Sequence, residues 1–146
     1  MIDIDFYWKQ LDKDAPLNPA CLEEDLFKIP QLQVKYIKFK TKENNILAHK
    51  EAEYKNLNLE KYDYYVNGLN ENTKKKGWPP IKNKILKSEV DRYLDADQDL
   101  NDLRITIAQL KELVKNLEYF LSHLAFRYNI IKETLRNRRS NEGQSS

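Results

Sequence analysis

Lysine and aromatic side chains are interleaved over residues 54–78 of this 146-residue chain. Cations along such a stretch can hold the phosphates of a single-stranded nucleic acid, and aromatic rings can stack on its bases, each stack contributing about 1–3 kcal/mol. The nucleic-acid-binding candidates, from this stretch and the residues just after it, are Lys55, Lys61, Tyr64, Tyr65, Lys74, Lys75, Lys76, Trp78, Lys82 and Lys84. The competing interpretation makes the tyrosines core residues of a helix and the lysines its solvated face.

Trp78 is the candidate that the competing interpretation explains least well. It lies in a polar stretch between a run of lysines and two prolines, where no apolar partner is evident. Composition alone therefore favours the core interpretation for the tyrosines, whereas the linker lysines and Trp78 favour binding.

Residue types that support catalysis are few. No Ser, Cys or His lies in a nucleophile motif, and nothing places two carboxylates together in an apolar pocket. Cys21 has no histidine near it in the sequence, and His49 and His123 are far apart. We therefore expect no enzyme and no cofactor.

The sequence Asp95-x-Asp97-x-Asp99 resembles the start of a calcium-binding loop. Such a loop needs Gly at its sixth position and Glu at its twelfth, where this chain has Leu100 and Thr106. We therefore predict no metal site and interpret Asp97 or Asp99 as the N-cap of a helix.

Charge is sorted along the chain, although the formal net charge is only +2. Residues 1–34 carry a net charge of −4 and residues 88–102 carry −5, whereas residues 35–87 carry +7 and residues 103–146 carry +4. A basic centre of this kind attracts a polyanion by Coulomb attraction and counterion release. A lysine-rich helix face in solvent explains the same pattern, so charge alone does not decide between them.

Two long helices must position these side chains. Residues 31–66 contain neither Pro nor Gly and repeat large apolar residues with helical spacing, which predicts one helix that ends near Gly68. Residues 67–80 are predicted to be a basic linker without regular structure, because they hold two glycines and two prolines. Residues 81–96 fit a short helix and an extended segment equally well.

The second helix, predicted over residues 97–138, carries the clearest pattern in the chain. Its apolar residues alternate steps of three and four, as the a and d positions of a coiled coil do. The predicted oligomerisation residues are Leu100, Leu103, Ile107, Leu110, Val114, Leu117, Leu121, Leu124, Tyr128 and Ile131. Leu113 and Phe120 widen this apolar face, so we expect it to pack against the first helix and against other subunits.

The predicted fold class is all-α, with the two helices joined by the basic linker and a short irregular segment. Residues 1–30 are expected to form an irregular acidic arm, in which Pro30 ends a short helix. Residues 31–138 are expected to form a single helical domain, and residues 139–146 a disordered tail. With 33% charged and 40% hydrophobic residues, a single chain has few apolar residues with which to build a buried core. This composition favours a homo-oligomer.

Neither a membrane span nor a secretion signal is expected. No window holds the roughly 18 apolar residues that cross a bilayer, and the acidic start Met1-Ile2-Asp3-Ile4-Asp5 lacks the basic residues of a signal peptide. We expect a cytoplasmic protein that contacts no membrane.

Four short segments occur in an order that is typical of one family. They are Asp63-Tyr64-Tyr65 with Gly68 soon after, Leu86-Lys87-Ser88-Glu89, Tyr93-Leu94-Asp95-Ala96-Asp97-Gln98-Asp99, and Arg127-Tyr128-Asn129-Ile130-Ile131-Lys132. In this order and spacing, about residues 30–135 resemble the UvsY family of phage recombination mediators.

The resemblance implies a non-enzymatic protein of phage DNA recombination, repair and replication in the host-cell cytoplasm. Such proteins bind single-stranded DNA and help a RecA-like recombinase (UvsX) displace the phage single-strand-binding protein and load onto the DNA. The resemblance also implies a homo-oligomeric ring of hexamer or heptamer size, held together by the C-terminal helix.

The resemblance assigns DNA contact to about residues 50–87. Lys61 matches one basic position of the family's DNA-contact region, and Leu59 stands where the family has another basic residue. Lys55 or the linker lysines are expected to compensate for Leu59.

Other classes of protein need features of their own. A coiled-coil structural or assembly protein of a phage explains the heptads and the sorted charge without DNA, and binding of single-stranded DNA separates it from a mediator. A double-strand binder needs a recognition helix, and none stands out. A small helical enzyme needs a pocket with perturbed titratable groups, which the residue pattern does not predict.

Overall fold

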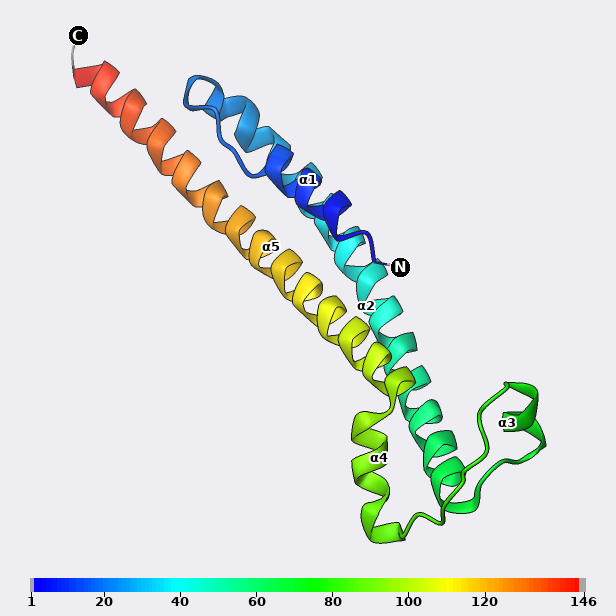
Figure 1. Cartoon of the computed structure of the whole chain (residues 1–146). Coiled ribbons are helices and arrows are strands. Elements are labelled where there is room, and N and C mark those ends of the chain that lie inside the picture. The colour runs from blue at the N-terminus through cyan, green and yellow to red at the C-terminus, as the bar shows by residue number, and fades with distance from the viewer. Residues whose placement is uncertain (1, 145–146) are drawn as a thin grey trace. The chain divides into compact units, whose positions relative to one another are not determined.

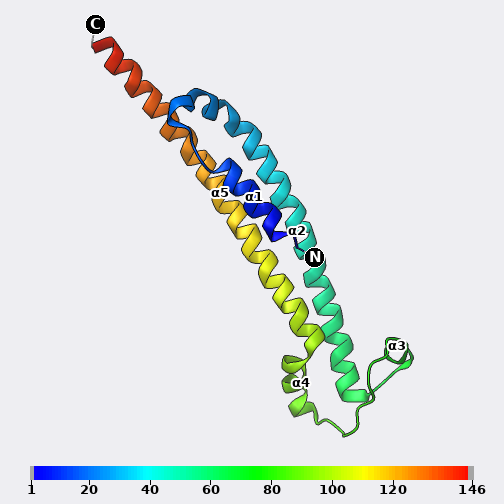
Figure 2. The ribbon, with the colours of Figure 1, turned by 45° about the horizontal axis from the view of Figure 1, so that its top comes forward.

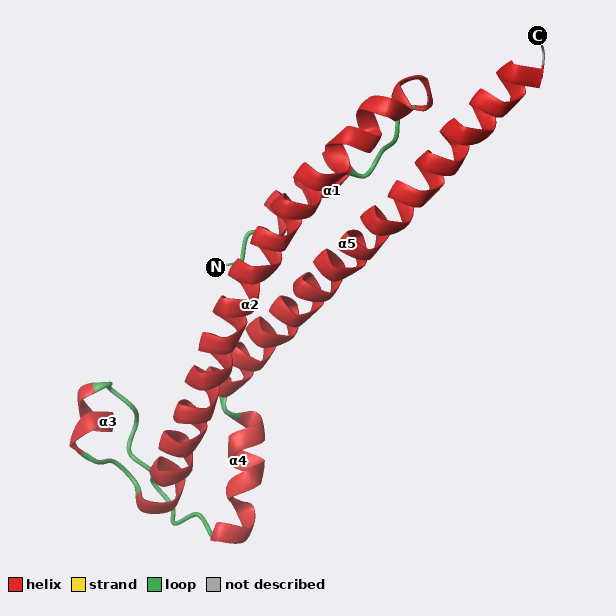
Figure 3. Cartoon of the chain, turned by 180° about the vertical axis from the view of Figure 1, so that it is seen from behind, coloured by secondary structure: helices red, strands yellow, loops and turns green. Residues whose placement is uncertain are grey.

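The computed structural model describes residues 2–144, which form helices and loops without a strand (Figures 1 and 3). The elements in chain order are α1 (Ile4–Asp14), the 3-10 turn η1 (Pro19–Cys21), α2 (Leu22–Asn67), α3 (Glu71–Lys75), the 3-10 turn η2 (Lys87–Glu89), α4 (Val90–Ala96) and α5 (Gln98–Gln144). The all-α prediction is confirmed. Within residues 2–144, no helix combines the length and the apolar character needed to cross a membrane.

The helices build two compact units, where the sequence predicts a single helical domain. The first unit consists of the described residues up to Asn44 and from Leu110 onward, and the second of residues 45–109. Each of the long helices α2 and α5 contributes a segment to both units.

The first long helix begins earlier than predicted. Helix α2 starts at Leu22, not near residue 31, and Pro30 lies inside it. A proline inside a helix costs about 3 kcal/mol because it removes a hydrogen bond and crowds the preceding turn. Ile29 is buried in the core of the first unit, and Leu22 and Leu26 pack partly buried against it. Full burial of such a side chain stabilises by about 1.5–3 kcal/mol, and partial burial by less. Their combined burial outweighs the cost of Pro30, and the prediction that Pro30 ends a helix is wrong.

Helix α1 replaces the irregular arm predicted for residues 1–30. Its N-terminus is capped by Asp3, whose carboxylate accepts a hydrogen bond from the Phe6 N–H at 3.0 Å. At its C-terminal end, the buried guanidinium of Arg127 donates hydrogen bonds to the carbonyl oxygens of Asp14, at 3.2 Å, and Ala15. Helix α1 packs along α2 and α5 in the first unit (Figure 2), and the contacts of Arg127 hold its C-terminal end there.

Two buried tyrosines hold α1 and α2 together. The Tyr7 hydroxyl donates to a carboxylate oxygen of Glu43 at 2.6 Å, and the Tyr36 hydroxyl donates to Asp14 at 2.9 Å. The same carboxylate of Asp14 accepts from the Lys35 ammonium at 2.6 Å. Burial, followed by the hydrogen bond to a carboxylate, raises the pKa of both tyrosine hydroxyls, so they stay protonated donors.

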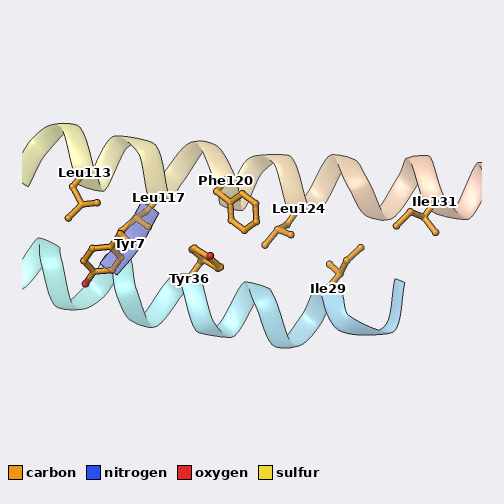
Figure 4. Packing of buried hydrophobic residues seen from close by; sticks show 8 residues of the cluster. All are labelled: Tyr7, Ile29, Tyr36, Leu113, Leu117, Phe120, Leu124 and Ile131. Atoms are coloured by element: carbon orange, nitrogen blue, oxygen red, sulfur yellow. The ribbon is translucent and has the colours of Figure 1, made fainter. Parts of the chain in front are cut away.

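The core of the first unit is the apolar stripe of α5 packed on α1 and α2 (Figure 4). The rings of Tyr36 and Phe120 pack at a tilt of 56° with their centroids 4.5 Å apart. Both belong to one cluster with Leu117, Leu124 and Ile131. The last three are residues of the predicted heptad array, and they are buried inside a single chain. The physical reason is that α2 supplies the apolar partner that the sequence predicts, and α1, which the sequence does not predict, supplies a second.

The predicted oligomerisation residues are therefore mostly buried within the protomer itself. Leu100, Leu110, Val114, Leu117, Leu124 and Ile131 are buried, Leu103, Ile107 and Leu121 are half-buried, and Tyr128 is 43% exposed.

The C-terminal segment predicted to be a disordered tail continues α5. Residues 139–144 are helical, and residues 145–146 lie outside the described residues.

The intrachain core can be tested at Leu117, which has no exposed surface. Leu117→Ala should lower the free energy of unfolding by about 2–5 kcal/mol, because it leaves a cavity in the core. The matched control is Leu59→Ala, the same chemical change at a residue that is 70% exposed. Urea unfolding followed by circular dichroism measures both, and equal stability of the two variants would contradict the packing described here.

Candidate nucleic-acid interface

The candidate residues lie in the second unit, on the C-terminal part of α2 and the loop that follows it. Helix α2 ends where predicted, because Gly68 adopts a φ of +80° and its N–H donates to the Tyr64 carbonyl at 2.9 Å. A glycine in this left-handed conformation is the usual residue after a helix C-terminus. We call residues 68–86 the basic loop, since they carry five lysines and one acidic residue.

A short helix interrupts the segment predicted to be irregular. Helix α3 begins after Asn70, whose side chain accepts from the Thr73 N–H at 2.8 Å, while the Thr73 hydroxyl accepts from the Asn70 N–H at 2.9 Å. This reciprocal pair is a capping box. The spacing of Asn70 and Thr73 was the sequence signal for α3, and the nearby glycines and prolines obscured it.

The ambiguous residues 81–96 contain both of the structures considered. Residues 81–86 have no regular structure, whereas α4 is helical. This segment is anchored by a small apolar cluster that consists of Ile85, Val90, Leu94 and Leu100, with Tyr54, Leu57, Tyr65, Val66 and Ile81 packed against it.

The buried Lys61 pairs with two carboxylates of this unit, the buried Asp97 and the exposed Asp99. Its ammonium lies 2.8 Å from a carboxylate oxygen of Asp99 and 3.1 Å from one of Asp97. Lys61 and Asp97 are each only 6% exposed. Burial by itself would lower the pKa of Lys61, but hydrogen bonds to Asp99 and Asp97 raise it on balance, so the ammonium stays charged.

Asp97 joins this ion pair to the start of α5. It accepts hydrogen bonds from the Tyr65 hydroxyl at 2.6 Å and from the Leu100 N–H at 3.0 Å, so it is the N-cap that the sequence left open between Asp97 and Asp99. Burial would raise the pKa of Asp97, but the hydrogen bonds from Tyr65, Leu100 and Lys61 lower it on balance. Burial and the hydrogen bond to Asp97 raise the pKa of Tyr65.

Trp78 packs against the same lysine. The Lys61 ammonium lies 4.1 Å from the centroid of the indole ring, which is cation–π distance. Tyr64 meets Trp78 edge to face at a centroid distance of 5.0 Å and donates its hydroxyl hydrogen bond to the Pro79 carbonyl. The interpretation of Trp78 as a residue without an apolar partner is therefore wrong, because that partner comes from the preceding helix.

The structure divides the predicted binding residues into two groups. Lys61 and Tyr64 are buried, and Tyr65 and Trp78 are half-buried. The exposed candidates are Lys55, Lys74, Lys75, Lys76, Lys82 and Lys84. Of these, Lys76 is paired with Glu60 at 2.7 Å.

The sequence interpretation missed the roles of Asp97, Asp99 and Glu60 as partners of lysines. The signal for Asp97 and Asp99 was present in the acidic segment, but the distance of nearly forty positions from Lys61 hid the pairing. Within residues 2–144, no group of three or more His, Cys, Asp or Glu side chains is arranged to hold a metal ion.

Comparison with known proteins places these residues in a family. A family model described as "Recombination, repair and ssDNA binding protein UvsY" matches residues 10–144. Two crystal structures of the bacteriophage T4 recombination mediator protein UvsY, in lattice types IV and II, are similar in fold. The first has a TM-score of 0.75 at 17% identity and covers 97% of this chain and 99% of its own. The second has a TM-score of 0.77 at 19% identity and covers 98% of this chain and 99% of its own.

Comparison with curated protein sequences finds no significant match. The family model nevertheless spans nearly the whole chain and includes every segment that carried the resemblance in the sequence. The chain therefore belongs to the UvsY family.

Proposed function

We propose that this protein is a recombination mediator that binds single-stranded DNA and helps load a RecA-like recombinase (UvsX) onto DNA covered by the phage single-strand-binding protein. The observation that carries the proposal is the set of exposed lysines on the basic loop, found in a chain of the UvsY family. The site of action is DNA in the infected host cell.

The basic loop suits a polyanion that must be held without regard to its sequence. Lys74, Lys75, Lys82 and Lys84 are exposed, and neutralising phosphates releases condensed counterions. The loop residues are anchored at Trp78 and at the apolar cluster around Ile85. Affinity should fall steeply with salt, since phosphate contacts dominate such an interface.

We infer that copies of this chain assemble through a second apolar surface of the first unit. Phe27 and Val34 on α2 are 79% and 53% exposed, and Tyr119 and Phe126 on α5 are 62% and 71% exposed. Each lies two positions along its helix from a buried core residue, which is about 200° around the helix. The exposed stripes of α2 and α5 therefore lie on the sides turned away from the core.

Two different stripes favour a ring over a symmetric dimer. If the α2 stripe of one copy packs on the α5 stripe of the next, the contact is heterologous, and such contacts generate closed rings when the rotation closes. Ile37 and Ile130, 52% and 55% exposed, extend the two stripes. A hexamer or heptamer agrees with the size that the sequence resemblance implies.

A ring explains how weak sites hold one strand. Each basic loop offers few phosphate contacts, but several loops on one particle raise the effective concentration of the next site for a strand already bound. A strand wrapped or bent in this way is then loosened from the single-strand-binding protein and presented to the recombinase.

The loop lysines can be tested together. Replacement of Lys74, Lys75 and Lys76 by Ala should weaken binding of a single-stranded oligonucleotide. It should also reduce the slope of log affinity against log salt by roughly 0.7 for each phosphate that the variant no longer neutralises. Fluorescence anisotropy at several salt concentrations measures both.

The matched control replaces Lys9, Lys13 and Lys28, three exposed lysines of the first unit, by Ala. It removes the same charge and should retain most of the affinity. Equally weak binding by the two triple variants would remove the basic loop from the interface.

The assembly surface can be tested at Phe126. Phe126→Asp should yield smaller particles with an intact fold, because it places a charge in an apolar contact between copies while the exposed side chain contributes little to the protomer. Ala125→Asp adds the same charge at an exposed position about 100° around the helix and should preserve the particle. Light scattering measures the mass, and an unchanged mass for Phe126→Asp would reject this surface.

A further inference from the structure

We infer that Lys61 is a positioning residue, which holds Trp78 and the base of the basic loop through its pairing with Asp97 and Asp99, and that DNA phosphates bind the exposed lysines instead. This inference rests on the proposed function, and it assigns to Lys61 a role different from the DNA contact that the sequence resemblance implies.

The donors of Lys61 are already engaged. An ammonium has three hydrogen-bond donors. Two point to Asp97 and Asp99, at 3.1 Å and 2.8 Å, and the indole ring of Trp78 lies 4.1 Å away. Two of the three donors are therefore taken, the indole face covers the ammonium, and with 6% of its surface exposed Lys61 leaves a phosphate little room to approach.

The local charge also disfavours a phosphate at Lys61. Two carboxylates surround one ammonium, which leaves this cluster with a net negative charge. A DNA phosphate near Lys61 therefore meets repulsion from Asp97 and Asp99 at close range.

Lys61 and its partners link the C-terminal part of α2, the start of α5 and Trp78 of the basic loop. Asp97 caps α5 and accepts a hydrogen bond from the Tyr65 hydroxyl. The Tyr64 hydroxyl donates a hydrogen bond to the Pro79 carbonyl, and the Tyr64 ring packs on Trp78. Trp78 lies in the sequence between the lysines at 74–76 and those at 82 and 84. Fixing Trp78 therefore fixes the position of both groups of lysines relative to the C-terminal part of α2.

The alternative is that the two carboxylates mask Lys61 until DNA displaces them. The two accounts predict opposite signs for one change. If Asp97 and Asp99 only mask a DNA-binding lysine, neutralising them should tighten binding. If Asp97 and Asp99 instead hold a positioning lysine in place, neutralising them should weaken DNA binding, although the change removes negative charge from the protein.

The test is the double variant Asp97→Asn, Asp99→Asn in a Trp8→Phe background. Asparagine is as good an N-cap as aspartate, so α5 keeps its start, and thermal unfolding checks that the fold survives. We expect affinity for a single-stranded oligonucleotide to fall by about tenfold, the equivalent of about 1.4 kcal/mol. The control, Asp91→Asn with Asp102→Asn, makes the same charge change at exposed residues of the acidic segment and should bind equally well or more tightly.

A measurement without DNA separates this inference from the proposed function. With Trp8 replaced, Trp78 is the one remaining tryptophan of the chain, and its quenching by acrylamide reports its exposure. Quenching should rise in the Asp97, Asp99 variant and in Lys61→Met, and stay constant in the control.

The outcomes are distinct. Tighter DNA binding by the Asp97, Asp99 variant, or unchanged quenching of Trp78, would overturn the positioning role. If the parent protein does not bind single-stranded DNA, the proposed function is overturned. The quenching result would then support or reject the positioning role of Lys61 by itself.

Discussion

Burial of the heptad stripe of α5 within its own chain is the constraint on which the rest of the structure depends. Leu117 and Leu124 are fully buried in the core of the first unit. An apolar side chain contributes its transfer free energy once, so residues used inside the protomer are not free to join subunits. The exposed stripes that include Phe27 and Phe126 are therefore the surfaces that we propose for assembly.

The lysines of the second unit fall into two groups: those that hold parts of the chain together, and those whose exposed ammonium groups can contact DNA. Removing one partner from a buried ion pair is strongly destabilising, whereas a pair as a whole contributes little net stability. The pair of Lys61 and Asp97 is therefore better understood as a device that specifies how α2, α5 and Trp78 meet. Exposed lysines such as Lys74 carry no such constraint and are available to a polyanion. The phage structural-protein alternative loses support, because the heptads that suggested it fill the intrachain core.

Sequence patterns predicted what depends on local spacing and missed what depends on distant partners. The helical array around Leu117 and the helix end at Gly68 follow from periodicity and from glycine conformation, and both are confirmed. Helix α1 was missed because its stability comes from residues such as Arg127, far along the chain. Pro30 was misjudged because the burial of neighbouring side chains outweighs a local rule. The pairing of Lys61 with Asp97 and Asp99 was missed because it is set by tertiary structure, which no spacing encodes.

The central claim is that several copies of this chain hold one unpaired DNA strand together. Native mass measurement of the purified protein, alone and mixed with a single-stranded oligonucleotide, tests it most directly. The account predicts a closed homo-oligomer that gains the mass of one strand shared among its copies. A single chain in both samples, or an oligomer whose mass does not change with the oligonucleotide, would contradict it.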